Sequence, residues 1–162
     1  MDGASAGTFG FGQAATEEEI AGWDIDILPD GTGLPEGSGT AAIGRELYIQ
    51  YGAAWHGAEG EGTEYAPALV GGIDSLDTDS PKKTVGSYWP YATSVFSYIR
   101  RAMPASGPQT LTNDEYYALT AWLLWANGLI AEDDVIDAET LPKVQMPNRD
   151  GFTSPDPRPD VG

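Results

Sequence analysis

One histidine and one methionine lie at two predicted helix ends and could together bind a metal-bearing cofactor. His56 is the only histidine of the chain, and it follows a predicted helix over residues 41–51 and opens a glycine-rich loop. Met103 ends a second predicted helix, over residues 93–102, just before Pro104. An imidazole and a thioether that face each other across a helical cleft form the axial pair of an electron-transfer haem, with no open position for a substrate. The spacing therefore predicts His56 and Met103 as metal ligands.

Both residues also have a purely structural interpretation. A lone histidine is most often solvated or hydrogen-bonded locally, and a lone methionine most often fills a gap in a core. Met146 also precedes a proline and is a rival candidate for the second ligand, although it lies beyond the last predicted helix. A catalytic haem enzyme would need an exchangeable axial position, which is harder to build without a second histidine or a cysteine.

Three core helices are predicted to position the two candidate ligands. In the first, Ile43, Leu47 and Tyr51 share one face, and Gly44 predicts that another helix approaches closely there. The second is short because Pro104 prevents its continuation. The third begins with a capping box at Thr112-x-x-Glu115 and stops at Asn127-Gly128.

The rest of the chain predicts loops and arms around a small all-α domain of three to four helices. Residues 1–39 form an extended arm with one short helix capped at Thr16, whose Ile20 and Trp23 are expected to dock on the core. Residues 40–130 form the domain itself, with a long loop over residues 57–92. Residues 131–162 are acidic and proline-rich and predict a wrapping tail. No strand pattern is evident.

Composition excludes several classes of function. The 162 residues include 8 Lys and Arg against 25 Asp and Glu, a formal charge of −17, which disfavours nucleic acids and anionic membrane surfaces as partners. The chain has no cysteine, which excludes disulfides, thiolate zinc sites and catalytic thiols. No apolar run approaches the ~18 residues of a membrane span. Met1-Asp2 begins no signal peptide, so we expect either that the chain is cytosolic or that a start methionine replaces its leader.

Several sequence blocks give the chain a family resemblance. The most specific are residues 83–93, KTVGSYWPYAT, and 98–104, YIRRAMP. Residues 22–26 and 29–35, the capped last helix and residues 146–152 support them. With these blocks the chain resembles class I cytochromes c, and among them the cytochrome c subunits of periplasmic sulfur dehydrogenases. The related cytochrome subunits of sulfite dehydrogenases are the nearest confusable group. The resemblance covers most of the chain.

The chain departs from this family at the haem attachment motif. The family attaches haem through C-x-x-C-H, whereas this chain reads G-A-A-W-H, with Gly52 and Trp55 in the cysteine positions. Covalent haem c would require cysteines at both positions. With the residues present, haem is bound noncovalently by His56 and Met103 or is not bound at all. Trp55 is expected to place its indole where the haem edge and a thioether belong, an overpacking that typically costs about 1–3 kcal/mol.

The resemblance also implies further cofactor contacts. Four of the eight bases lie within twenty residues, around an aromatic cluster, and they could bind the anionic haem propionates. Arg100 or Arg101 is the first candidate for this role and Lys83 the second. The cofactor-binding residues predicted in addition to the ligands are Gly52, Trp55, Pro67, Leu69, Lys83, Trp89, Tyr91, Arg100 and Arg101.

By resemblance the chain is an electron-transfer subunit rather than the catalytic subunit of an oxidoreductase. It would accept electrons from a molybdenum-containing dehydrogenase subunit and pass them to a small cytochrome c. The same resemblance implies a periplasmic protein whose leader has been removed. The alternative is a haemless interaction subunit that keeps only the docking arms of a cytochrome.

Overall fold

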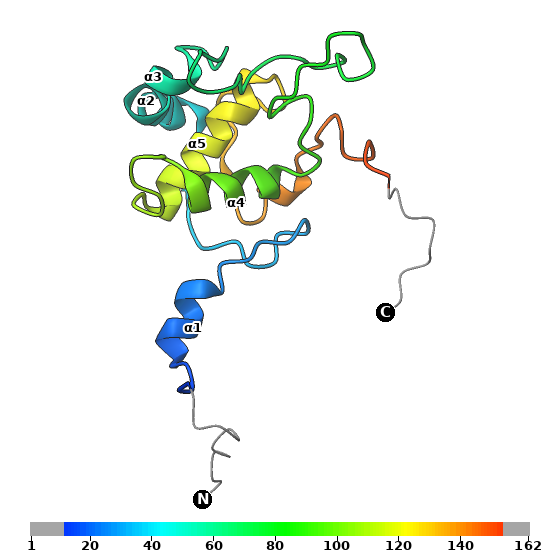
Figure 1. Ribbon diagram of the computed structural model, residues 1–162. Coiled ribbons are helices and arrows are strands. Elements are labelled where there is room, and N and C mark those ends of the chain that lie inside the picture. Colours follow the sequence, from blue (N-terminus) through cyan, green and yellow to red (C-terminus); the bar gives the residue numbers. More distant parts are fainter. Residues whose placement is uncertain (1–11, 154–162) are drawn as a thin grey trace, which may run out of the picture.

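A computed structural model of the protein describes residues 12–153, so the outer parts of both expected arms, residues 1–11 and 154–162, lie outside the described residues. The predicted all-α fold is confirmed, and each predicted helix is present (Figure 1). In chain order the elements are α1 (Glu17–Trp23), β1 (Ser38–Gly39), α2 (Ala41–Tyr51), α3 (Ala53–His56), α4 (Ala92–Ala102), α5 (Asn113–Ala126), β2 (Ile136–Asp137) and the 3-10 helix η1 (Leu141–Lys143).

The sequence did not predict two small elements. Strands β1 and β2 pair antiparallel, with Ser38 opposite Asp137 and Gly39 opposite Ile136. Two-residue strands are too short to show the alternation that marks a strand in sequence. The second element, α3, is a single turn that continues from α2 after Gly52 and ends at His56.

Helix α5 is the centre of the core. Nine consecutive residues, 116–124, are buried, because α2 packs against one side of the helix and α4 against another. The predicted capping box forms: the Glu115 backbone N–H donates to the Thr112 hydroxyl, and the Thr112 N–H donates to the Glu115 carboxylate. A helix that is apolar nearly all round must be enclosed by other elements, and α5 is.

Helix α2 packs on α5 through a different face from the one predicted. Ala41, Gly44 and Tyr48 are buried, whereas Ile43 is 56% exposed. The reason is the close approach at Gly44, where an added Cβ would overlap the Ala118 carbonyl. The prediction that Gly44 allows another helix to come close is confirmed. Of the predicted face of Ile43, Leu47 and Tyr51, the placement of Ile43 is wrong, whereas Leu47 packs against the core and Tyr51 is partly buried.

Within residues 12–39, the described part of the N-terminal arm, the contacts that anchor it to the domain lie in its second half. The Tyr117 hydroxyl donates to the Pro35 carbonyl at 2.8 Å, and the Asn113 side-chain amide donates to the Glu36 carbonyl at 3.0 Å. Helix α1 instead projects away from the domain (Figure 1). Ile20 is 55% and Trp23 88% exposed, so the prediction that they dock on the core is wrong.

The chain after α5 returns to the domain. Ile136, Leu141 and Met146 are buried in the core, and the Asn148 side chain donates to the Tyr88 carbonyl at 2.8 Å. Within residues 12–153 no helix has both the length and the apolar character that a bilayer crossing requires.

Replacing Gly44 with alanine should destabilise the domain, because the new methyl group must displace the α5 backbone. We expect a loss of about 1–3 kcal/mol in the free energy of unfolding, although alanine favours a helix over glycine by up to ~1 kcal/mol. Urea unfolding followed by circular dichroism measures it. Glu46→Ala, at an exposed position of the same helix, should change stability by less than ~0.5 kcal/mol. Wild-type stability for Gly44→Ala would contradict the helix packing described here.

Candidate functional site

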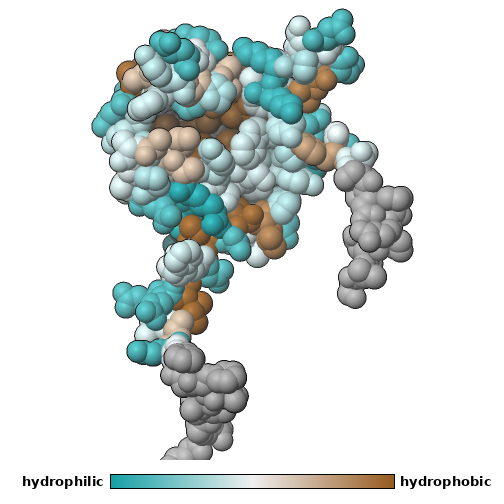
Figure 2. Space-filling view, in the orientation of Figure 1, coloured by the Kyte–Doolittle hydropathy of each residue, from teal (hydrophilic) through white to brown (hydrophobic). Residues whose placement is uncertain are grey.

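A cavity of about 470 Å³ opens between α2 and α3 on one side and α4 and α5 on the other. Its size lies within the range of small-molecule and cofactor sites. Apolar and aromatic side chains dominate the lining, and Figure 2 shows them gathered in a hollow of the domain surface. The lining includes the paired positions Val95 and Ile99 on α4 and Leu119 and Leu123 on α5, together with Tyr48, Tyr51, Tyr65 and Tyr98.

His56 enters the cavity from the end of α3, in the orientation expected of a metal ligand. Its Nδ1 lies 2.8 Å from the Pro67 carbonyl oxygen. A carbonyl can only accept, so this bond places the proton on Nδ1 and leaves the lone pair of Nε2 free. Metal-ligating histidines almost always hold their second nitrogen in such a bond, which fixes the tautomer and the ring.

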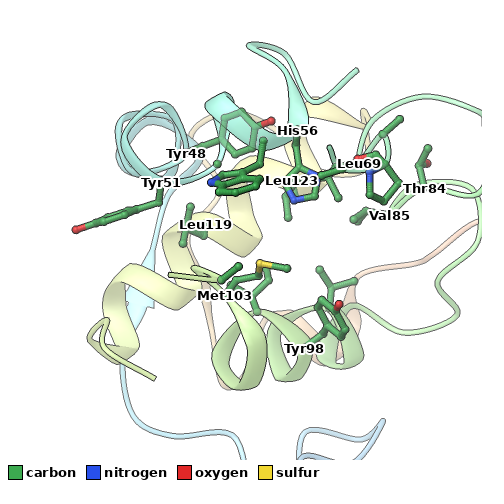
Figure 3. A pocket seen from close by; sticks show the side chains of 18 of the residues that line it. Tyr48, Tyr51, His56, Leu69, Thr84, Val85, Tyr98, Met103, Leu119 and Leu123 are labelled. Atoms are coloured by element: carbon green, nitrogen blue, oxygen red, sulfur yellow. Dashed lines mark hydrogen bonds between the residues drawn. The ribbon is translucent and has the colours of Figure 1, made fainter. Parts of the chain in front are cut away.

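Met103 lies on the opposite wall. It directly follows α4, and its backbone N–H still donates to the Ile99 carbonyl at 2.9 Å, so the helix end fixes its position. Figure 3 shows its sulfur directed into the gap, with His56 on the far side. Met146 is 4% exposed, packs in the core and is absent from the lining. Of these two thioethers, the cavity therefore offers that of Met103.

Gly52 lies where α2 gives way to α3, and the ring of Tyr48 covers it. A Cβ at residue 52 would lie 2.6 Å from Cδ2 and Cε2 of Tyr48. That ring has little freedom: it stacks on Trp122 with 3.7 Å between ring centroids, and its hydroxyl donates to the Gly57 carbonyl at 2.6 Å. Burial, with Glu61 and Glu59 nearby, raises the pKa of Tyr48 to about 12, so the phenol keeps its proton at neutral pH.

Trp55 borders the mouth of the cavity. It belongs to the lining but remains 51% exposed, and its indole meets the Tyr65 ring edge to face at 6.5 Å between centroids. The backbone carbonyl of Trp55 accepts a hydrogen bond from the Thr63 hydroxyl.

The predicted basic cluster divides between the cavity and the outer surface. Lys83 and Trp89 belong to the lining, and the Lys83 ammonium lies 4.9 Å from the centroid of the Tyr88 ring. Tyr91, Arg100 and Arg101 are outside it. Arg101 pairs with Asp26 of the arm at 2.5 Å, and the Arg149 guanidinium lies 5.1 Å from the centroid of the Tyr91 ring.

The structure thus brings eight of the eleven predicted site residues to one cavity: Gly52, Trp55, His56, Pro67, Leu69, Lys83, Trp89 and Met103. The residues missed by the sequence prediction are mainly core positions. Leu119 and Leu123, like Val95 and Ile99, show the i, i+4 spacing of any buried helix stripe. That spacing signals burial, and it does not distinguish a core from a cavity wall.

The cytochrome c family model matches residues 41–127 of the chain. The chain belongs to the cytochrome c family. In its three-dimensional structure the protein is similar to a chain of the sulfane dehydrogenase SoxCD from Paracoccus pantotrophus, with a TM-score of 0.85 and 46% sequence identity. That similarity covers 93% of this chain and 74% of the other. No curated protein sequence matches. The resemblance inferred from sequence blocks is therefore confirmed.

The residues present fit haem bound through axial ligands and do not fit covalent attachment. An imidazole nitrogen with a free lone pair, a thioether on the facing wall and an apolar cavity between them are the groups that a six-coordinate electron-transfer haem requires. The chain has no cysteine thiol to add across the haem vinyl groups. His56 and Met103 are therefore the residues that would hold the cofactor.

The overlap at Gly52 can be measured with a double-mutant cycle. Gly52→Ala alone should lower the free energy of unfolding by about 1–3 kcal/mol, because the methyl group meets a ring that is held in place. In a Tyr48→Leu background the same change should cost little, since the obstructing ring is gone. Equal effects of Gly52→Ala in both backgrounds, measured by urea unfolding, would show that Tyr48 does not fill the space beside residue 52.

Proposed function

We propose that the chain is an electron-transfer haem subunit that binds one haem noncovalently between His56 and Met103. The cytochrome c domain and the similarity to SoxCD indicate an electron-transfer subunit. The observation that carries the proposal for haem is the hydrogen bond from His56 Nδ1 to Pro67, which leaves Nε2 directed at the cavity faced by Met103. When bound, the haem iron supplies one-electron redox chemistry without bond making.

The chain's own groups tune such a site. The hydrogen bond to the Pro67 carbonyl fixes the orientation of the His56 ring and the nitrogen that it offers to a metal. The Met103 thioether is a soft donor that favours the reduced metal and raises the potential. Leu119, Leu123 and their apolar neighbours exclude water, which strengthens electrostatic interactions inside the cavity. At the mouth, the Lys83 ammonium is the cation best placed for a cofactor carboxylate.

The proposed electron donor and acceptor of the chain are inferred from its similarity to SoxCD. The donor would be a molybdenum-containing dehydrogenase subunit that oxidises sulfur compounds, and the acceptor a small cytochrome c, both in the periplasm. Support comes from the 46% identity to a chain of a sulfane dehydrogenase structure. The chain's formal charge of −17 suits an acceptor with a basic face.

A haemless interaction subunit is the second candidate. It is favoured by the absence of cysteines and by the Tyr48 ring over Gly52, which together remove the family's covalent attachment. The two candidates differ in one observable, the binding of haem by the purified chain.

Titrating the purified chain with haemin tests the proposal. The wild type should bind one equivalent and give a low-spin spectrum. His56→Ala should weaken binding by more than ~100-fold, beyond the 10–100-fold typical of losing only a supporting hydrogen bond. Met103→Ala should lower the midpoint potential by at least ~60 mV, a tenfold change in the relative affinity for reduced and oxidised iron.

Met146→Leu is the matched control, since it removes a buried thioether outside the cavity and should leave both spectrum and potential unchanged. No haem binding by the wild type, or equal binding by His56→Ala, would refute the proposal in favour of the haemless subunit.

A further inference from the structure

Helix α1 carries an apolar face that nothing in the described chain covers. None of its residues is buried, and Ile20 and Trp23, three positions apart on one face, are 55% and 88% exposed. Leu28, just beyond the helix, is 50% exposed. Large aromatic side chains left in water forgo their full burial energy, and tryptophan is the residue most enriched among the anchors of protein interfaces.

The first turn of α1 is stabilised by its own capping residues. Both halves of its capping box form: the Thr16 backbone N–H donates to the Glu19 carboxylate at 2.7 Å, and the Glu19 N–H donates to the Thr16 hydroxyl at 3.2 Å. A helix of seven residues is nevertheless marginal in water without packing on its apolar face. In Figure 2 brown side chains lie on this arm, well separated from the hollow of the domain.

An ion pair connects the N-terminal arm with α4, the helix that Met103 directly follows. Asp26, three residues after α1, pairs with Arg101 of α4 at 2.5 Å. Figure 1 shows α1 beyond α4, on the side away from α2 and α3. A molecule that binds α1 is therefore held on the α4 side of the domain.

The charge of the arm restricts what can cover it. Residues 12–39 include seven acids (Glu17, Glu18, Glu19, Asp24, Asp26, Asp30 and Glu36) and no lysine or arginine. A second copy of this chain carries the same excess of acid, and anionic lipid surfaces repel it as well. The complementary surface is an apolar groove with a basic rim, the kind that receives an amphipathic helix in helix-in-groove recognition.

From these observations we propose that α1 is the docking element for the partner protein, with Trp23 as its anchor and Ile20 beside it in an apolar groove bordered by lysine and arginine. The partner is the molybdenum-containing dehydrogenase subunit, and this choice rests on the proposed function. The acids of the first helical turn, Glu17 and Glu18, meet the basic rim. The arm then holds that partner on the side of the domain that carries Met103.

The test measures binding of the full haem-loaded chain to the purified molybdenum subunit from the same organism. Ile20→Ala/Trp23→Ala should raise the Kd at least ~10-fold, as loss of an interface anchor does. Ile49→Ala is the matched control, since Ile49 is 58% exposed on α2, and it should change the Kd less than ~2-fold. Glu17→Gln/Glu18→Gln should weaken binding and flatten its dependence on salt. Amide hydrogens of residues 17–23 should exchange more slowly in the complex.

Any one of the following results would overturn the docking proposal. These are binding by the Ile20/Trp23 variant equal to wild type, unchanged exchange of the α1 amides in the complex, and no binding of the wild-type chain. Self-association that depends on Trp23 would assign the face to a second copy and overturn it too. The haem spectrum, read on the same samples, separates the two proposals. Tight docking without haem refutes only the haem relay, whereas haem binding with Trp23-independent docking refutes only the role of α1.

Discussion

The close packing of α2 on α5 at Gly44 is the contact on which the rest of the domain depends. It fixes the end of α2, from which α3 presents His56, and it presses the Tyr48 ring against Trp122. The other side of α5 holds α4, whose end presents Met103. The cavity lies between α2 and α3 on one side and α4 and α5 on the other, and Leu119 and Leu123 of α5 line it. A side chain at position 44 would therefore disturb the ligand geometry and the core together.

The proposed site pairs a histidine with a methionine across one cavity and has no cysteine for covalent attachment. In a covalent cytochrome c, two thioether bonds keep the haem in place whatever the strength of the axial bonds. In the proposed site, which has no thiol, retention of haem would depend on His56, on Met103 and on the apolar contacts of the cavity. The hydrogen bond from His56 to the Pro67 carbonyl would matter more in that situation, because it orients the imidazole without help from a bound cofactor.

The sequence predicted those features that depend on local chemistry. Capping boxes mark the starts of α1 and α5, and the positions of His56 and Met103 at two predicted helix ends led to two residues that line one cavity. Features that depend on how elements meet in space were predicted less well. Gly44 was correctly predicted to allow the close approach of another helix, but Ile43 was wrongly placed on the packed face, because the closest helix contact selects the smallest side chain. Arg101 was expected near the cofactor but points outward to Asp26, a pairing across 75 positions of sequence that no local pattern reveals.

The mass of the haem-loaded chain, measured first under native and then under denaturing conditions, tests the central claim most directly. A site that holds its cofactor only through His56, Met103 and cavity contacts predicts a native mass equal to the polypeptide plus one haem. It also predicts a denatured mass equal to the polypeptide alone, since the chain has no thiol that could retain the group. A native mass without haem, after loading with excess haemin, would contradict the account.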